Sequence, residues 1–190
     1  AVKMDRKFNY PLTLKGHGFF SNDNYEMSLE TFRTLLLIDP RHYNALYGIG
    51  MVYINLGDYQ KADFHFRKAV LINPINVILI CCVGMVLEKT GKRQLALKQY
   101  DLANKLQTLN PLPICKKAQL LFTMQEFTSA LEYFEQLKEL APEEALVHFL
   151  LGQLYKIQND KFKAIREFTI ALLLDPKGNY LIRDAMESLK

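Results

Sequence analysis

The residue types best suited to metal binding or nucleophilic catalysis are few and scattered in this sequence. Its four histidines, His17, His42, His65 and His148, lie far apart along the chain. No HExxH motif places two of them on one helix face as zinc ligands. The phosphate-binding motifs GxxxxGK[ST] and GxGxxG and the nucleophile motif GxSxG do not occur. The sequence therefore predicts no catalytic site, no metal site and no cofactor.

The cysteines and the charges exclude further classes. Cys81, Cys82 and Cys115 form no CxxC pair, which predicts reduced thiols and a reducing compartment. The formal net charge of +4 is spread without a basic run, so a nucleic-acid partner is not expected. The longest apolar stretch, 77–87, is too short to cross a bilayer, and no signal peptide is apparent. We expect a soluble intracellular protein with no membrane partner.

The elements that would position any site follow a 34-residue period. Four prolines mark it, with spacings of 34, 68 and 34 residues: Pro40, Pro74, Pro142 and Pro176. Units that begin at Asn9, Tyr43, Val77, Pro111 and Ala145 align the rest. The eighth place is small in every unit: Gly16, Gly50, Gly84, Ala118 and Gly152. The twenty-fourth is aromatic: Phe32, Phe66, Tyr100, Phe134 and Phe168.

This pattern resembles the tetratricopeptide repeat (TPR). Small residues let the two helices of a hairpin approach closely, and the large residues fill the space around that contact. Gly57 and Gly91 stand where the first helix must turn into the second. The resemblance predicts an all-α fold, a TPR superhelix (α-solenoid) of five helical hairpins plus a C-terminal capping helix. The expected divisions are 1–8 as the end of a preceding repeat, 9–42, 43–76, 77–110, 111–144 and 145–178 as repeats, and 179–190 as the cap.

Both ends and the first turn carry expectations of their own. Because Ala1 falls late in a repeat, we expect the chain to be part of a longer array. Residues 179–190 predict an amphipathic helix with Leu181, Ile182, Ala185, Met186 and Leu189 on its apolar side. In the first unit, a polar loop over 21–24 is expected in place of the short turn.

The concave wall of stacked repeats is the expected binding site. On a helix, the second, fifth, ninth and twelfth places of each unit share one face. The candidates are Tyr10, His17, Asn44, Tyr47, Met51, Ile54, Ile78, Cys81, Met85, Glu88 and Gln119. This wall is largely apolar with Glu88 as its acid, so it either binds a partner or is covered by neighbouring repeats or another subunit.

One known mode of binding by such repeats is not expected here. TPR proteins that hold the acidic tails of heat-shock chaperones use a clamp of lysine, arginine and asparagine. At the corresponding places of this chain only Lys116 is basic. The sequence therefore does not predict a chaperone adaptor.

Segments beyond the generic pattern resemble one family. Residues 39–50, DPRHYNALYGIG, resemble a segment of subunit 3 of the anaphase-promoting complex, as do 8–17, 73–82, 148–152 and 175–178. The resemblance implies a non-catalytic scaffold in a cell-cycle ubiquitin ligase, acting in nucleus and cytoplasm with the other subunits of that complex. The family's Gly-His-Glu reads Gly16-His17-Gly18 here.

The family resemblance also implies a ligand for the wall. It predicts capture of the C-terminal Ile-Arg tails of coactivators and of the processivity subunit. The candidates for the isoleucine pocket are Tyr47, Met51, Ile78 and Met85. Glu88 would pair with the arginine, and Asn44, Gln119 or a backbone donor would bind the terminal carboxylate.

Three alternatives stay open at this point. The chain could serve a purely structural role, in which this wall only packs against other subunits. It could be a paralogous TPR subunit of the same complex. It could also be the TPR arm of an unrelated enzyme, such as a protein glycosyltransferase.

Overall fold

The computed structural model describes residues 6–176 and 179–188, and within them every regular element is an α-helix. The helices are α1 (Arg6–Ser21), α2 (Tyr25–Ile38), α3 (Tyr43–Asn55), α4 (Tyr59–Ile72), α5 (Val77–Lys89), α6 (Arg93–Leu106), α7 (Pro111–Thr123), α8 (Phe127–Leu140), α9 (Ala145–Ile157), α10 (Lys161–Leu174) and α11 (Asn179–Glu187). The predicted all-α fold is confirmed. The chain divides into an N-terminal unit, 1–106, and a C-terminal unit, 107–190.

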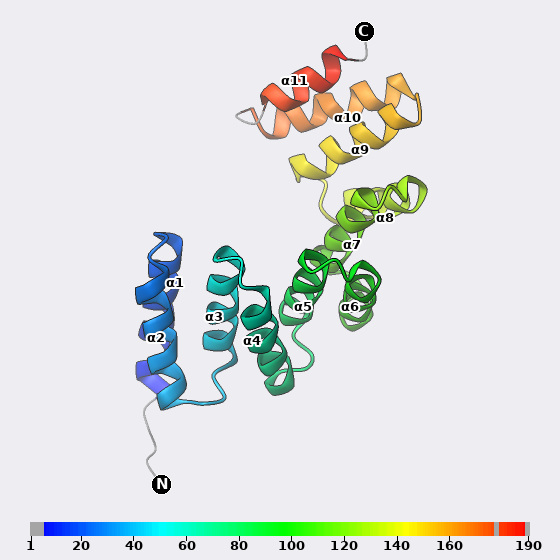
Figure 1. Cartoon of the computed structure of the whole chain (residues 1–190). Coiled ribbons are helices and arrows are strands. Elements are labelled where there is room, and N and C mark those ends of the chain that lie inside the picture. The colour runs from blue at the N-terminus through cyan, green and yellow to red at the C-terminus, as the bar shows by residue number, and fades with distance from the viewer. Residues whose placement is uncertain (1–5, 177–178, 189–190) are drawn as a thin grey trace. The chain divides into compact units, whose positions relative to one another are not determined.

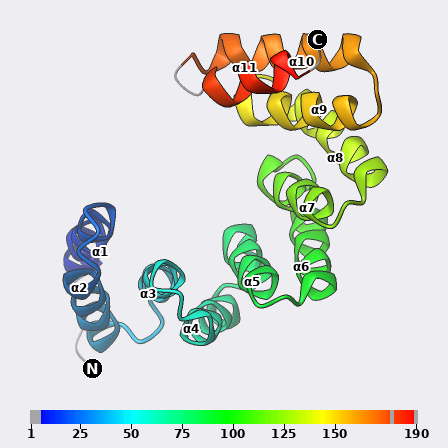
Figure 2. The ribbon, with the colours of Figure 1, turned by 45° about the horizontal axis from the view of Figure 1, so that its top comes forward.

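Consecutive helices pair as antiparallel hairpins within each unit (Figure 1). In the N-terminal unit the pairs are α1 with α2, α3 with α4 and α5 with α6, and each hairpin packs on the next. In the C-terminal unit α7 pairs with α8 and α9 with α10. The short α11 lies along α10 (Figure 2). Nearly all packing is thus between helices that follow one another in the chain.

The centre of each hairpin is the contact between the eighth and the twenty-fourth place. A Cβ atom on Gly84 would lie 2.5 Å from Cε1 of Tyr100, a side chain with no exposed surface. The same relation joins Gly152 to Phe168, also at 2.5 Å. A ring that fills the volume a side chain would need leaves glycine as the residue that fits these two hairpins without rearrangement.

The turn inside each hairpin has the same backbone form in all five. The fifteenth place of each unit has a positive φ angle: Asp23 (56°), Gly57 (75°), Gly91 (78°), Gln125 (64°) and Asn159 (61°). The expectation of an irregular polar loop over 21–24 is therefore wrong. The amide of Asn24 donates to the Phe19 carbonyl at 2.9 Å, as the amide of Asp58 does to that of Tyr53. Aspartate and asparagine tolerate this left-handed conformation, so a turn without glycine keeps the regular geometry.

The ends of the chain differ in detail from the sequence expectations. Helix α1 begins at Arg6, three residues before Asn9, and contains Pro11; residues 1–5 lie outside those described. In α11 the side chains of Ile182 and Ala185 are buried as expected, but Leu181 is 52% exposed. The apolar stripe of α11 is therefore narrower than its sequence indicates. Leu189 lies outside the described residues.

Candidate functional site

The N-terminal unit brings most of the predicted site residues onto the first helices of its three hairpins. They recur at spacings of three, four or seven residues on α1, α3 and α5, so each set follows one helix face. We call this surface the A-helix face: Tyr10 and His17 on α1, Asn44, Tyr47, Met51 and Ile54 on α3, and Ile78, Met85 and Glu88 on α5.

Exposure varies along the A-helix face. Tyr10 is 70% and Ile78 is 50% exposed, and Asn44 is exposed as well. The remaining members, including Met51 and Met85, are half-buried. Apolar side chains that keep part of their surface in water leave the face able to gain free energy by burying a ligand's apolar groups.

His17 and Tyr47 connect α1 to α3 across the face. Their ring centroids lie 6.3 Å apart, and His17 also meets Phe32 edge-on at 5.1 Å. Burial lowers the pKa of His17, so its imidazole is uncharged at neutral pH. Tyr47 packs against the core of Leu46 and Leu79, and burial raises its pKa. The middle of the face is therefore a neutral aromatic surface.

Two predicted residues are not counted in the A-helix face. Cys81, at the fifth place of its repeat on α5, is only 4% exposed. The prediction that Cys81 lines an accessible wall is corrected accordingly. Gln119 lies on α7 in the C-terminal unit, where it is half-buried.

Glu88 accepts a hydrogen bond from Tyr100, a residue to which the repeat pattern assigns only a packing role in the core. The Tyr100 hydroxyl donates to Oε2 of Glu88 at 3.1 Å. Burial, and next the charge of Glu88, raise the pKa of Tyr100, so the phenol stays protonated and donates. This hydrogen bond could have been suspected from the sequence, because Tyr100 is the single tyrosine among the five aromatic residues at the twenty-fourth place. A buried phenol needs a partner, and the carboxylate of the same hairpin provides it.

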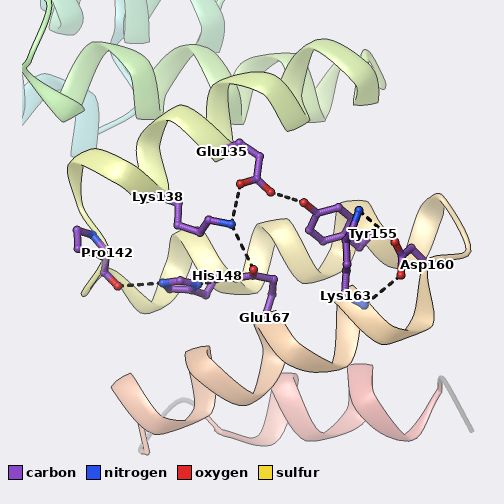
Figure 3. A network of polar contacts seen from close by, with 8 residues as sticks. All are labelled: Glu135, Lys138, Pro142, His148, Tyr155, Asp160, Lys163 and Glu167. Atoms are coloured by element: carbon purple, nitrogen blue, oxygen red, sulfur yellow. Dashed lines mark hydrogen bonds and ion pairs between the residues drawn. The ribbon is translucent and has the colours of Figure 1, made fainter.

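The C-terminal unit contains a polar network that links α8, α9 and α10 (Figure 3). His148 and Glu167, which are 4% and 5% exposed, meet through Nδ1 and Oε2 at 2.6 Å. Nε2 of His148 lies 2.9 Å from the Pro142 carbonyl oxygen. Lys138 pairs with Glu167 at 3.4 Å and with Glu135 at 2.6 Å. Each member has a partner within the protein, which indicates a structural network between repeats.

In the same unit, second- and fifth-place residues line a hollow of about 280 Å³ between α7, α8 and α9. Its lining residues include Leu112, Cys115, Leu137, Ala141 and Leu146.

Across the described ranges, no three histidine, cysteine or acidic side chains gather as metal ligands would. Nor does any helix in those ranges combine the length and the apolarity that crossing a membrane requires.

Family models and several known proteins match this chain. Models of the tetratricopeptide repeat match residues 43–76 and 115–179. Anaphase-promoting complex subunit 3 of Schizosaccharomyces pombe is 44% identical over 189 residues, which covers 100% of this chain and 28% of that protein. Protein bimA of Emericella nidulans is 47% identical over 189 residues, covering 100% and 23%. The cell division cycle protein 27 homolog of Caenorhabditis elegans is 39% identical over 185 residues, covering 97% and 24%. The chain thus spans about a quarter of the length of these relatives.

Solved structures share the fold. In the crystal structure of the hetero-tetramer Cut9–Hcn1 of the anaphase-promoting complex, a chain superposes with a TM-score of 0.81 at 16% identity, covering 95% of this chain and 36% of that one. YrrB, described as a TPR protein with an unusual peptide-binding site, gives 0.65 at 23% identity, covering 97% and 93%. At these identities the likeness concerns the fold alone. The predicted TPR solenoid class is confirmed.

Proposed function

The whole of this chain is homologous to one part of anaphase-promoting complex subunit 3, and we propose that it works as a TPR scaffold segment of that complex. The observation that carries this proposal is the 44% identity over 189 residues to the fission-yeast subunit. Proteins made of TPR hairpins act by presenting surfaces to partners. The proposed role is therefore contact with the other subunits of the assembly, without catalysis, in the nucleus and cytoplasm.

Within this role we propose that the A-helix face binds the C-terminal Ile-Arg tails of coactivator and processivity subunits. Tyr47, Met51, Ile78 and Met85 offer half-buried or exposed apolar surface for an isoleucine. Glu88 offers a carboxylate whose orientation is fixed by the Tyr100 hydroxyl at 3.1 Å. An arginine fork pairs best with a carboxylate held in one orientation, since less side-chain entropy is lost on binding.

A peptide titration tests the tail proposal. A labelled peptide that ends in Ile-Arg should bind the chain, and removal of the terminal arginine should weaken it at least tenfold. Glu88→Gln should cause a similar loss, because the charge-assisted pair disappears. Tyr100→Phe keeps the ring in the core but releases the carboxylate, so a smaller loss of about threefold is expected.

A matched control distinguishes a contact from general electrostatics. Glu132 is exposed on α8 and is not one of the residues that define the A-helix face, so Glu132→Gln removes the same charge without changing that face. This control should leave the affinity unchanged. If the peptide binds equally well without its terminal arginine, or if both glutamine variants act alike, the tail proposal is wrong.

The structural alternative keeps one specific observation in its favour, which is the breadth of exposed apolar surface on the A-helix face. If the face only packs against another subunit, Tyr10→Ala and Ile78→Ala should reduce incorporation of the full-length protein into the complex. The same variants would leave tail affinity within about twofold. Co-purification of the assembled complex alongside the titration distinguishes the two roles.

A further inference from the structure

Two junctions between successive repeats are built alike, one in each unit. Tyr53 and Tyr155 occupy the eleventh place of their repeats. The Nζ atom of Lys61 lies 5.2 Å from the centroid of the Tyr53 ring, and that of Lys163 lies 5.2 Å from the Tyr155 ring. Each lysine also forms an ion pair with the aspartate three residues before it. We call the two regions the Tyr53 junction and the Tyr155 junction. Because both tyrosines have the same lysine and aspartate neighbours, the charged residues around them can be compared at equivalent places of the repeat.

The Tyr155 junction carries its own acids and neutralises them (Figure 3). The Tyr155 hydroxyl donates to Glu135, which stands at the twenty-fifth place of the preceding repeat. Glu167 stands at the twenty-third place of the same repeat as Tyr155. Lys138 bridges the two carboxylates, at 2.6 Å from Glu135 and 3.4 Å from Glu167. This junction therefore needs no external ion.

The Tyr53 junction has basic residues at the same two places. Arg33 replaces the first glutamate, and its Nη2 donates to the Tyr53 hydroxyl at 3.2 Å. His65 replaces the second, with its ring stacked on Tyr53 at a centroid distance of 5.8 Å. Lys68 follows His65 by one helical turn on α4. We call Arg33, Tyr53, Lys61, His65 and Lys68 the Tyr53 cluster.

Most of the positive charge of the Tyr53 cluster has no carboxylate partner among the described residues. Within the described residues neither Arg33 nor Lys68 forms an ion pair, and Lys61 alone has a carboxylate partner, Asp58, at 2.7 Å. Burial lowers the pKa of His65, and the charges of Lys68 and Arg33 lower it further. Nδ1 of His65 is buried without a hydrogen-bond partner within the protein. Arg33 and the unpaired ring nitrogen of His65 thus stand at the two places where the other junction has carboxylates, and the charge of Lys68 acts on the same His65 ring.

The geometry points to an anion-binding site at the Tyr53 cluster, whose ligand is a phosphorylated side chain of a partner polypeptide. Arg33 and Lys68 contribute two free positive charges, and a phosphorylated side chain carries about −1.5 to −2 at neutral pH. The arginine fork can donate to two phosphate oxygens at once, and Lys68 and Lys61 can approach a third as point charges. A single carboxylate would leave one positive charge unmatched.

This site is separate in chemistry from the proposed tail site. The A-helix face offers apolar surface and one acid to a ligand that ends in arginine, whereas the Tyr53 cluster attracts a negative group. Arg33 and Lys68 lie on the second helices of their hairpins, α2 and α4, not on α1, α3 or α5. A chain that does not bind Ile-Arg peptides could therefore still bind a phosphorylated peptide at the Tyr53 cluster.

The test uses the 190-residue chain and a library of short peptides with a central phosphoserine, phosphothreonine or phosphotyrosine. A peptide retained from this library is then titrated, together with its unphosphorylated form and a form with glutamate at the central position. We expect the phosphorylated peptide to bind at least tenfold more tightly than either. Binding should raise the pKa of His65, followed by NMR of its ring, because an anion nearby favours the imidazolium.

Three variants decide whether the Tyr53 cluster is the site. Arg33→Gln should weaken the phosphopeptide at least tenfold, and Lys68→Gln about threefold. Arg166→Gln, which removes an exposed arginine of α10, should have no effect. Circular dichroism checks that each variant is folded, and an unchanged Ile-Arg titration shows that Arg33→Gln leaves the A-helix face intact. Equal binding of the glutamate peptide, equal losses in all three variants, or no effect of Arg33→Gln would overturn the assignment.

Discussion

Gly50 and Phe66 lie so close that a Cβ atom on the glycine would be 2.5 Å from Cε1 of the ring. Phe66 is completely buried, so the ring has no free space to enter. We expect Gly50→Ala to lower the free energy of unfolding by about 1–3 kcal/mol, the usual cost of overpacking a core. Urea denaturation followed by circular dichroism measures this.

A matched control is available on α1. A Cβ atom on Gly18 would meet no other atom within 4 Å, so Gly18→Ala should stabilise the helix by up to about 1 kcal/mol. Ala118 shows that the fourth hairpin accommodates a methyl group at the eighth place. If Gly50→Ala is as stable as the parent chain, the second hairpin has the same freedom and the steric argument is wrong.

Gly18 stands where the resembled family has glutamate, and a side chain at this place would find open space. Gly18→Glu should be tolerated, with a gain in stability of about 0.5–1 kcal/mol from helix propensity. If an acid at this place contributes to tail binding, the affinity for an Ile-Arg peptide should rise severalfold. Gly18→Gln is the control, because it supplies the same length and helix propensity without the charge. Equal affinities of the two variants would show that the charge has no role.

The buried pair His148–Glu167 should matter more to stability than any exposed ion pair. Glu167→Ala leaves Nδ1 of His148 without its 2.6 Å partner in a buried position. Removal of one member of a buried pair costs about 3–5 kcal/mol. Thermal and urea denaturation should show this loss, whereas Glu139→Ala on the exposed side of α8 should change stability by less than about 0.5 kcal/mol. A loss below about 1 kcal/mol for Glu167→Ala would contradict the assigned role.

The turn at Gln125 gives a prediction with the opposite sign. Gln125 has a φ angle of 64°, a left-handed conformation that costs a residue with a side chain about 1–2 kcal/mol. Gln125→Gly should stabilise the fourth hairpin by about 0.5–1 kcal/mol, after the greater entropy of glycine in the unfolded chain is deducted. Gly57→Gln, with φ at 75°, should destabilise the second hairpin by a similar amount. Unfolding midpoints that move in the same direction for both variants would rule this explanation out.

Stability should decrease as the pH falls below the ordinary histidine range. Burial lowers the pKa of both His17 and His65 from 6.5, and for His65 the charges of Lys68 and Arg33 add to the shift. Protons then bind the unfolded chain more readily, so stability present above about pH 6.5 is lost as the pH falls through the folded values. His65→Gln should flatten this dependence between pH 7 and 5. A profile identical to that of the parent chain would show that His65 does not contribute.

The repeat pattern predicted the fold well because each of its places has one packing role. The expected starts at Tyr43, Val77, Pro111 and Ala145 are where α3, α5, α7 and α9 begin. The first turn was mispredicted because the sequence signal for a left-handed residue was read from glycine alone, and Asp23 adopts the same conformation.

The contacts of the candidate site were less predictable, because the 34-residue period does not show which pairs of residues meet. Cys81 is buried and Tyr47 is half-buried although both stand at the fifth place of a repeat, a difference that helical spacing alone cannot show. The contact between Tyr100 and Glu88 could have been inferred from the one tyrosine in an otherwise phenylalanine series. The bond between His148 and Glu167 depends on which helices meet at a junction, and that is known only from the structure.

The pairing of each helix with its sequence neighbour has a consequence for how the chain acquires its structure. Contacts between residues close in sequence give a low contact order, which is associated with fast folding. A hairpin needs only about one repeat length of chain, so it can form while later repeats are still being synthesised. Each folded hairpin then exposes a surface on which the next hairpin of its unit can pack. Amide hydrogen exchange should accordingly show protection that varies from hairpin to hairpin, without a single cooperative value for the whole chain.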